Sequence, residues 1–233
     1  PVVKILNDLL KICEIEFRCP VEIEFAVNLD YKEQKHHSFY LLQIRPIVDT
    51  KENIAEDIGS IPDNNLIISS ENALGHGVEN DIYDFVFVKP DAFNPSHNQL
   101  IAYDIEKINE QLCRESRPYV LVGPGRWGSS DTWLGIPVKW PQISNARVIV
   151  ESGLSNYRIE PSQGTHFFQN LTSFGVSYLT INPYMGDGTY DLDYLNSLPV
   201  ENETKFIKHL RFSSPIQVKV DGRKNKGVIV KPE

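Results

Sequence analysis

Two neighbouring segments near the start of the chain constrain its fold most strongly, because both alternate along their length like β-strands. They read EIEFAV at residues 22–27 and FYLLQIRPI at residues 39–47. Successive side chains of a strand point to opposite faces, so Glu22 and Glu24 share one face of the first segment. Ile23, Phe25 and Val27 share the other face, which is therefore predicted to pack into a core.

The second segment divides in the same way. Gln43 and Arg45 are expected to point together, and Tyr40, Leu42 and Ile44 are expected on the opposite face. If the two strands pair with their apolar faces in the core, two carboxylates, an amide and a guanidinium meet on the opposite face. Carboxylates hold magnesium, and a guanidinium donates to phosphate oxygens. The alternative is an exposed hairpin with ordinary cross-strand Glu–Arg pairs.

These residues also carry a family resemblance. The sequence E-I-E-F, a variable loop and then Y-L-L-Q-I-R-P resembles the end of the nucleotide-binding domain of phosphoenolpyruvate synthases and pyruvate phosphate dikinases. The resemblance implies that residues 1–49 are the C-terminal segment of an ATP-grasp domain. It also implies ATP and Mg²⁺ as cofactors, with Glu24 binding magnesium–ATP. Gln43 and Arg45 would contact the phosphates, with Glu22 as a neighbour.

The beginning of the chain predicts a piece of a longer protein, since it starts at Pro1 and holds one methionine. Residues 2–17 repeat apolar side chains at helical spacing, as at Ile5, Leu9 and Ile12. In the family, the parts that hold adenine lie upstream of the strand pair. The chain is therefore expected to supply one wall of the ATP site and to be inactive alone.

Composition narrows the class of protein further. The 233 residues, of which 41% are hydrophobic, are enough to bury a sizeable core. A net charge of −8 argues against nucleic acid as a partner. No apolar run approaches the ~20 residues of a membrane span. The cysteines (Cys13, Cys19 and Cys113) lack metal spacing, which favours a reduced, cytoplasmic setting.

The remaining sequence predicts a mixed α/β (α+β) fold. Residues 50–64 are expected to form a linker, residues 65–182 a β/α domain, and residues 183–233 a C-terminal extension. The extension should contain a small helix at 203–212 and a hairpin that turns at Asp221 and Gly222.

Local signals place two helix starts. Ser96, with Gln99 three residues later, predicts the N-cap of a helix. The apolar stripe of that helix is Ile101, Ile105, Ile108 and Leu112. Asp187, Asp191 and Asp193 are interpreted as helix-capping residues, because the glutamate of a calcium loop is missing.

Residues 65–182 resemble the swivelling phosphohistidine domain of the same family. The order YVLV, ARVIVE, SQGTHFFQNLTSFG and VSYLTI agrees with that domain and implies His166 as a phosphoryl carrier. A helix N-terminus welcomes an attached phosphate, and imidazole is a competent nucleophile. The family pattern G-G-x-T-S-H-A-A differs, however, because Phe167 and Phe168 replace two alanines. A buried histidine in a sensor or docking module is the alternative.

The loop GPGRWGSSD at residues 123–131 is a second candidate site. Its glycines permit close backbone approach to a ligand, Arg126 suits phosphate or carboxylate, and Trp127 could stack on a ring. Alternatively, the loop is a tight turn in which Trp127, Trp133 and Trp140 fill a core.

The leading hypothesis is part of an ATP-dependent phosphotransferase of the kinase or dikinase type. It would pass a phosphoryl group from ATP through His166 towards pyruvate or another acceptor bound by missing domains. The rivals are the sensor module and an unrelated ligand-binding or enzymatic site at residues 123–131.

Overall fold

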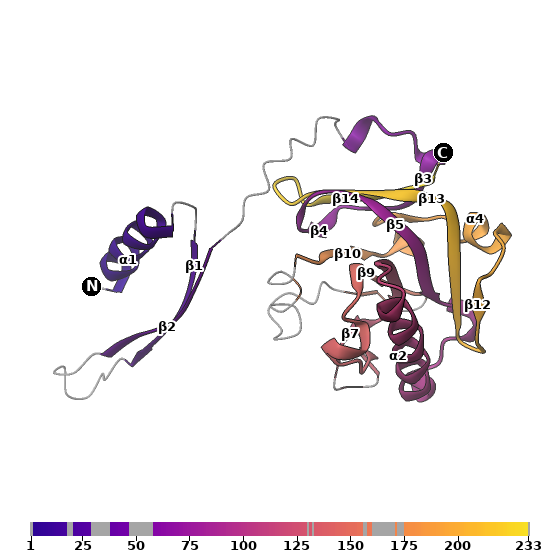
Figure 1. Cartoon of the computed structure of the whole chain (residues 1–233), viewed down its shortest axis with the longest axis horizontal. Helices are drawn as coiled ribbons and strands as arrows, with labels where there is room; N and C mark the ends of the chain where they lie inside the picture. The colour runs from indigo at the N-terminus through magenta and orange to yellow at the C-terminus, as the bar shows by residue number, and fades with distance from the viewer. Residues whose placement is uncertain are drawn as a thin grey trace. The chain divides into compact units, whose positions relative to one another are not determined.

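The computed structural model describes residues 2–17, 21–28, 38–46, 58–129, 131, 133–155, 158–159, 171 and 175–232. The chain divides into two compact units, Pro1–Lys51 and Glu52–Glu233 (Figure 1). Each unit is described by itself. Among the helices of the described residues, none is long and apolar enough to cross a membrane.

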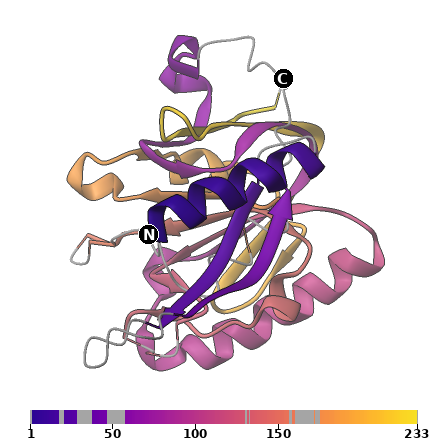
Figure 2. The ribbon, with the colours of Figure 1, turned by 90° about the vertical axis from the view of Figure 1, so that its left-hand side faces the viewer.

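The first unit contains a helix, α1 (Val2–Phe17), and two antiparallel strands, β1 (Val21–Asn28) and β2 (Ser38–Pro46). Figure 2 shows α1 lying across the strand pair. The predicted helix is present, but its packed face is rotated from the expected stripe. Cys13 is 6% exposed, whereas Ile5 and Ile12 are 39% and 58% exposed. Leu9 of the expected stripe is partly buried, and Leu6 and Leu10 are partly buried beside it.

A β-bulge in β2 corrects the expected faces of the strand pair. The register joins Glu24 to Gln43 but Phe25 to Leu41, so Leu42 is an extra residue. The bulge reverses the alternation, and Tyr40 therefore falls on the polar face instead of the apolar one. Tyr40 and Leu42 are 57% and 59% exposed. Only Ile44 keeps its expected side.

Phe39, near the start of β2, lies on the apolar face of the strand pair instead. The rings of Phe25 and Phe39 stack with their centroids 5.3 Å apart. This stacking fixes the half of the strand pair beyond the bulge.

The second unit is a mixed α/β fold built on a ten-stranded sheet. The order of its main path is β11-β3-β14-β13-β5-β6-β9-β10-β4, and β12 pairs with β13. The pairs β5–β6, β6–β9 and β9–β10 are parallel, and the other pairs of this sheet are antiparallel. The strands are β3 (Leu66–Ser70), β4 (Asn72–Leu74), β5 (His76–Val88), β6 (Tyr119–Pro124), β9 (Ala146–Ser152), β10 (Ser177–Ile181), β11 (Thr189–Tyr190), β12 (Asn202–Glu203), β13 (Ile207–Asp221) and β14 (Lys226–Val230).

The sheet curls, so that strands distant in its order come close together. Ser70 Oγ on β3 donates a hydrogen bond to the Thr180 carbonyl on β10, at 2.7 Å. The Ala73 N–H on β4 donates to the Asn225 carbonyl, just before β14, at 2.9 Å. The curl encloses one apolar core, whose members include Ile67, Phe85, Val120, Leu179 and Ile216.

A second core lies under the helix α2 (Asn98–Arg114), which connects β5 to β6. The predicted stripe is confirmed, since Ile101, Ile105, Ile108 and Leu112 are all at most 3% exposed. The predicted N-cap is wrong. Ser96 lies in a 3₁₀ turn, η4 (Pro95–His97), and its N–H donates to Asn94 Oδ1 at 2.9 Å. Asn94 therefore caps a turn before the helix, and His97 precedes α2 without a side-chain cap.

The C-terminal residues differ from the expected extension. Residues 203–212, predicted as a helix, form the end of β12 and the start of β13. Their apolar spacing resembles a helix, but pairing with β5 and burial of His209 among charged partners favour a strand. The hairpin at Asp221 is confirmed, and its strands β13 and β14 lie within the main sheet. Residues 183–233 are thus integral to the second unit.

The second unit also contains one short helix, two short strands and several 3₁₀ turns among its described residues. Asp191 caps the helix α4 (Leu192–Ser197) by accepting from the Tyr194 N–H at 2.9 Å, as the sequence predicted. Asp187 does not cap a helix; it accepts from the side-chain amides of Asn72 and Asn182. The remaining elements are β7 (Arg126–Trp127), β8 (Gly135–Ile136), and the 3₁₀ turns η1 (Ile58–Ser60), η2 (Asp63–Asn65), η3 (Pro90–Ala92), η5 (Trp140–Ile143) and η6 (Pro183–Met185).

Candidate functional site

A pocket of about 560 Å³ lies at the carboxyl ends of the four parallel strands of the second unit. Asp91 follows β5, Gly125 follows β6, Ser155 follows β9, and Tyr184 follows β10. Ligands of α/β proteins commonly bind at this edge of the sheet, and the volume is typical of small-molecule sites. We call this cavity the carboxyl-edge pocket.

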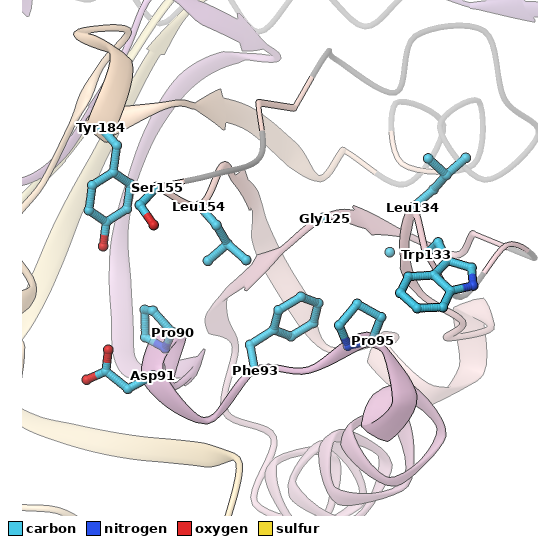
Figure 3. A pocket seen from close by; sticks show the side chains of 11 residues that line it. Pro90, Asp91, Phe93, Pro95, Gly125, Trp133, Leu134, Leu154, Ser155 and Tyr184 are labelled. Atoms are coloured by element: carbon cyan, nitrogen blue, oxygen red, sulfur yellow. The ribbon is translucent and has the colours of Figure 1, made fainter.

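The lining of the carboxyl-edge pocket divides into two parts (Figure 3). Asp91, Ser155 and Tyr184 bring a carboxylate and two hydroxyls to one side. The other side is a ring-rich wall of Phe93, Pro95, Trp133 and Leu134. Among the described lining residues, Asp91 is the only one with a charged side chain. The pocket therefore combines a hydrogen-bonding end with an apolar end.

The loop predicted as a ligand site contributes Gly125 to this pocket, and backbone hydrogen bonds tie the loop to residues 134–136. The Arg126 N–H donates to the Leu134 carbonyl, and the Gly128 N–H donates to the Ile136 carbonyl, each at 2.9 Å. Gly125 has φ +79°, and a Cβ on Gly135 would lie 1.8 Å from the Arg126 carbonyl oxygen. Close backbone packing thus requires glycine at position 135 and favours it at position 125.

Trp127 anchors the loop to the sheet and is 2% exposed. Its Nε1–H donates to the Val150 carbonyl at 3.0 Å, and its backbone N–H donates to Glu151 Oε1 at 2.9 Å. Glu151 also accepts from the Tyr178 hydroxyl, and Thr180 donates to that hydroxyl. Trp127 thus fills the core.

The two other tryptophans behave differently. Trp140 is partly buried against the core, whereas Trp133 is 75% exposed at the pocket. The ring available for stacking on a ligand is therefore Trp133. Arg126, predicted as the ligand contact, is half-buried and is not among the described lining residues.

The predicted nucleotide-binding residues lie in the first unit. Glu22 pairs directly with Arg45, and Glu24 pairs directly with Gln43. Side chains of directly paired residues share a face of the sheet, so the backbone register puts all four positions on one face. Glu22, Glu24 and Gln43 are exposed, and the side chain of Arg45 lies outside the described residues.

The predicted phosphoryl carrier falls outside the described part of the structure. His166, Phe167 and Phe168 belong to residues 160–170, which are not described. The strands on either side are described, and β10 pairs in parallel with β9. The runs ARVIVE and VSYLTI therefore form neighbouring strands.

A buried ionic cluster was missed by the sequence analysis. Asp84 is fully buried and accepts from Arg117, His209 and Arg211. Asp84 pairs with Tyr119, the first residue of β6, so it lies away from the carboxyl edge. The Arg211 guanidinium also binds Glu115 and Glu201 at 2.6 and 2.9 Å. The one available signal was an acidic residue within the apolar run of β5.

Burial raises the pKa of Asp84, but the hydrogen bonds from His209, Arg211 and Arg117 outweigh it and hold that pKa below its usual value. The carboxylate is therefore ionised at neutral pH. The cluster joins β5 to β13 and to Arg117, just before β6, at the amino end of the parallel strands.

No cluster of three or more potential metal ligands occurs among the residues that the structure describes. Glu24 would therefore need further ligands from a nucleotide or from another part of a longer protein. Comparisons of the chain with protein-family models, curated proteins and solved structures find no significant match.

Proposed function

We propose that this chain is part of an ATP-dependent phosphotransferase similar to phosphoenolpyruvate synthase and pyruvate phosphate dikinase. Its first unit would supply one wall of a magnesium–ATP site. The supporting observation is the register of β1 and β2, which pairs Glu22 with Arg45 and Glu24 with Gln43. Two acidic positions thereby share one face with Gln43 and Arg45, the proposed phosphate contacts.

Each residue has a distinct role in this proposal. Glu24 is the magnesium ligand, because Mg²⁺ is typically held by one or two carboxylates together with substrate phosphates. Arg45 and Gln43 donate to phosphate oxygens, and Glu22 orients Arg45 from the opposite strand position. Magnesium, when bound, neutralises charge on the transferring phosphoryl group. The acceptor, pyruvate or another compound, would bind elsewhere in the longer protein.

Binding of magnesium–ATP to the full-length protein, measured by calorimetry, tests this proposal. Glu24→Gln removes an anionic ligand and should weaken binding about tenfold or more, since charged interactions contribute about 1.5–3 kcal/mol. Glu14→Gln is the matched control, because Glu14 is exposed on α1. Equal affinities for the two variants would contradict the metal role of Glu24.

For the second unit, the proposal makes His166 the phosphoryl carrier between ATP and the acceptor. The parallel pairing of β9 with β10 on either side of it agrees with the order of strands in the swivelling domain. Mass spectrometry of the full-length protein after ATP treatment should find phosphate on His166. An unphosphorylated His166, with activity retained in His166→Ala, would favour the sensor alternative.

A second proposed function is ligand binding by the carboxyl-edge pocket. It is supported by the volume of about 560 Å³ and by the position of the pocket across four parallel strand ends. Trp133 lines the pocket and is 75% exposed, so a bound ligand should change its fluorescence. Ligands that alter the fluorescence of wild-type chain but not of Trp133→Phe would support this function.

A further inference from the structure

The two-part lining of the carboxyl-edge pocket points to the kind of ligand it takes. We propose that the pocket binds an uncharged small molecule in which a flat ring is joined to a hydroxyl-bearing group, the chemistry shared by nucleosides and aromatic glycosides. This inference rests on the second proposed function, ligand binding at the pocket. It does not depend on the phosphotransferase proposal for the first unit.

The ring end of the ligand is indicated by the apolar wall. Phe93, Pro95, Trp133 and Leu134 lie together on one side of the pocket (Figure 3). An indole that is 75% exposed leaves much apolar area in water. Covering it with a ring is favourable, because aromatic side chains gain both area burial and stacking.

The hydroxyl-bearing end is indicated by the polar side. The Asp91 carboxylate accepts hydrogen bonds, whereas the hydroxyls of Ser155 and Tyr184 both donate and accept. Ligand hydroxyls also donate and accept, so they match this mixed set. An ammonium group only donates, so it would pair with the carboxylate but could not accept from the two side-chain hydroxyls.

A buried hydroxyl extends this polar side. A second small space, with room for about one water molecule, shares Pro90, Leu154 and Tyr184 with the carboxyl-edge pocket and is also lined by Tyr190. The Tyr190 hydroxyl is buried and has no hydrogen-bond partner among the described residues. Burial raises the pKa of this hydroxyl, so it stays protonated. It can therefore donate to a water that bridges to a ligand hydroxyl.

The charge of the described lining residues disfavours anionic ligands. Asp91 supplies the only charged side chain among the described lining residues, and it is negative. A phosphate in the pocket would be repelled by this carboxylate, and no described lining residue offers it a cationic side chain. The pocket should therefore discriminate between a nucleoside and its phosphorylated forms.

Calorimetry with the 233-residue chain tests the inference with four probes: adenosine, 4-nitrophenyl β-D-glucopyranoside, AMP and tryptamine. Adenosine or the glycoside should bind, and the two arms tell a nucleoside site from a glycoside site. AMP should bind at least about tenfold more weakly than adenosine if adenosine is the ligand. Asp91→Asn should weaken the neutral ligand about tenfold, since it removes a charged acceptor.

Two matched controls isolate the pocket. Asp81→Asn changes an exposed aspartate on β5 that is not among the pocket residues, and it should leave affinity unchanged. Trp133→Ala should weaken the neutral ligand about fivefold through lost stacking, whereas Tyr103→Ala, a 54% exposed ring on α2, should not.

The outcomes distinguish failure of the proposed ligand class from failure of the pocket as a binding site. AMP binding as tightly as adenosine, or an affinity unaffected by Asp91→Asn, overturns the inference. Tryptamine binding that depends on Trp133, with no binding of either neutral probe, overturns the ligand class but leaves the pocket as a binding site. Failure of all four probes to bind overturns both.

Discussion

Replacing Asp84 with asparagine should destabilise the second unit strongly. The carboxylate is fully buried, and Oδ2 accepts from Arg117 Nε at 2.7 Å. Oδ1 accepts from His209 Nε2 at 2.7 Å and from Arg211 Nε at 2.8 Å. Asparagine keeps the shape but removes the charge and puts an N–H₂ group where one oxygen accepted. At least one of the three donors then loses its partner.

The expected loss of unfolding free energy in Asp84→Asn depends on how deeply its three partners are buried. Removing one member of a buried ion pair typically costs about 3–5 kcal/mol. Arg117 and Arg211 are 32% and 27% exposed and keep some hydration, whereas His209 is fully buried. The low end, about 3 kcal/mol, is therefore expected. With a urea slope of about 2 kcal/mol/M, the unfolding midpoint should fall by about 1.5 M.

Urea unfolding of the 233-residue chain at pH 7, followed by circular dichroism, measures this shift. Asp81→Asn is the control, because Asp81 is exposed on the same strand. Midpoints of Asp84→Asn and wild type that agree within about 0.3 M would refute the reasoning, since that difference is below 1 kcal/mol.

The hydrogen bonds to the Asp84 carboxylate also predict that the free energy of unfolding depends on pH. The pKa of Asp84 is lowered in the folded state. Its stabilisation is thus fully present above the unfolded pKa of about 3.9 and is lost as pH falls through the folded value. The difference between wild type and Asp84→Asn should therefore shrink below about pH 4.

Three further substitutions test the local structure, each by urea unfolding. Gly135→Ala should destabilise by about 2–3 kcal/mol, because its Cβ would lie 1.8 Å from the Arg126 carbonyl oxygen; unchanged stability would contradict the tight β7–β8 contact. Asp191→Ala should cost about 1 kcal/mol through the lost N-cap, and the loss should disappear in acid, because hydrogen bonds from Lys231 and the Tyr194 N–H lower the pKa of Asp191. Trp127→Phe should cost about 1 kcal/mol or more, since it removes the Nε1–H bond; a neutral effect would mean that this bond does not anchor the loop.

Strongly periodic segments were predictable from sequence. The stripe from Ile101 to Leu112 identified α2, since each of its members repeats at helical spacing and is buried. The runs ARVIVE and VSYLTI were predicted as strands, and they form the neighbouring strands β9 and β10. In both cases local pattern and tertiary packing require the same structure.

Predictions failed where tertiary contacts decide the structure. Residues 203–212 have helical apolar spacing, but the pairing of β13 with β5 makes them strands. The bulge at Leu42 leaves no signal in the sequence, yet it moves Tyr40 to the opposite face. Ser96 lost its expected capping role because Asn94, two residues earlier, caps a 3₁₀ turn first.

The candidate sites were likewise predictable where they depend on local pattern and not where they depend on tertiary contacts. The polar face of β1 and β2 could be predicted because it depends on local alternation and on one register. The loop at residues 123–131 was predicted as a ligand site, and Gly125 does line the carboxyl-edge pocket. Asp91, Ser155 and Tyr184 were not predicted, because they come from three separate loops that only the sheet brings together.

The central proposal, a magnesium–nucleotide site on the polar face of β1 and β2, is tested most directly by an experimental structure. The full-length protein would be solved with Mg²⁺ and a non-hydrolysable ATP analogue. The proposal predicts a Glu24 carboxylate oxygen at about 2.0–2.1 Å from the metal, with Arg45 and Gln43 contacting phosphate oxygens. A nucleotide bound elsewhere, with Glu24 and Arg45 contacting neither metal nor phosphate, would contradict it.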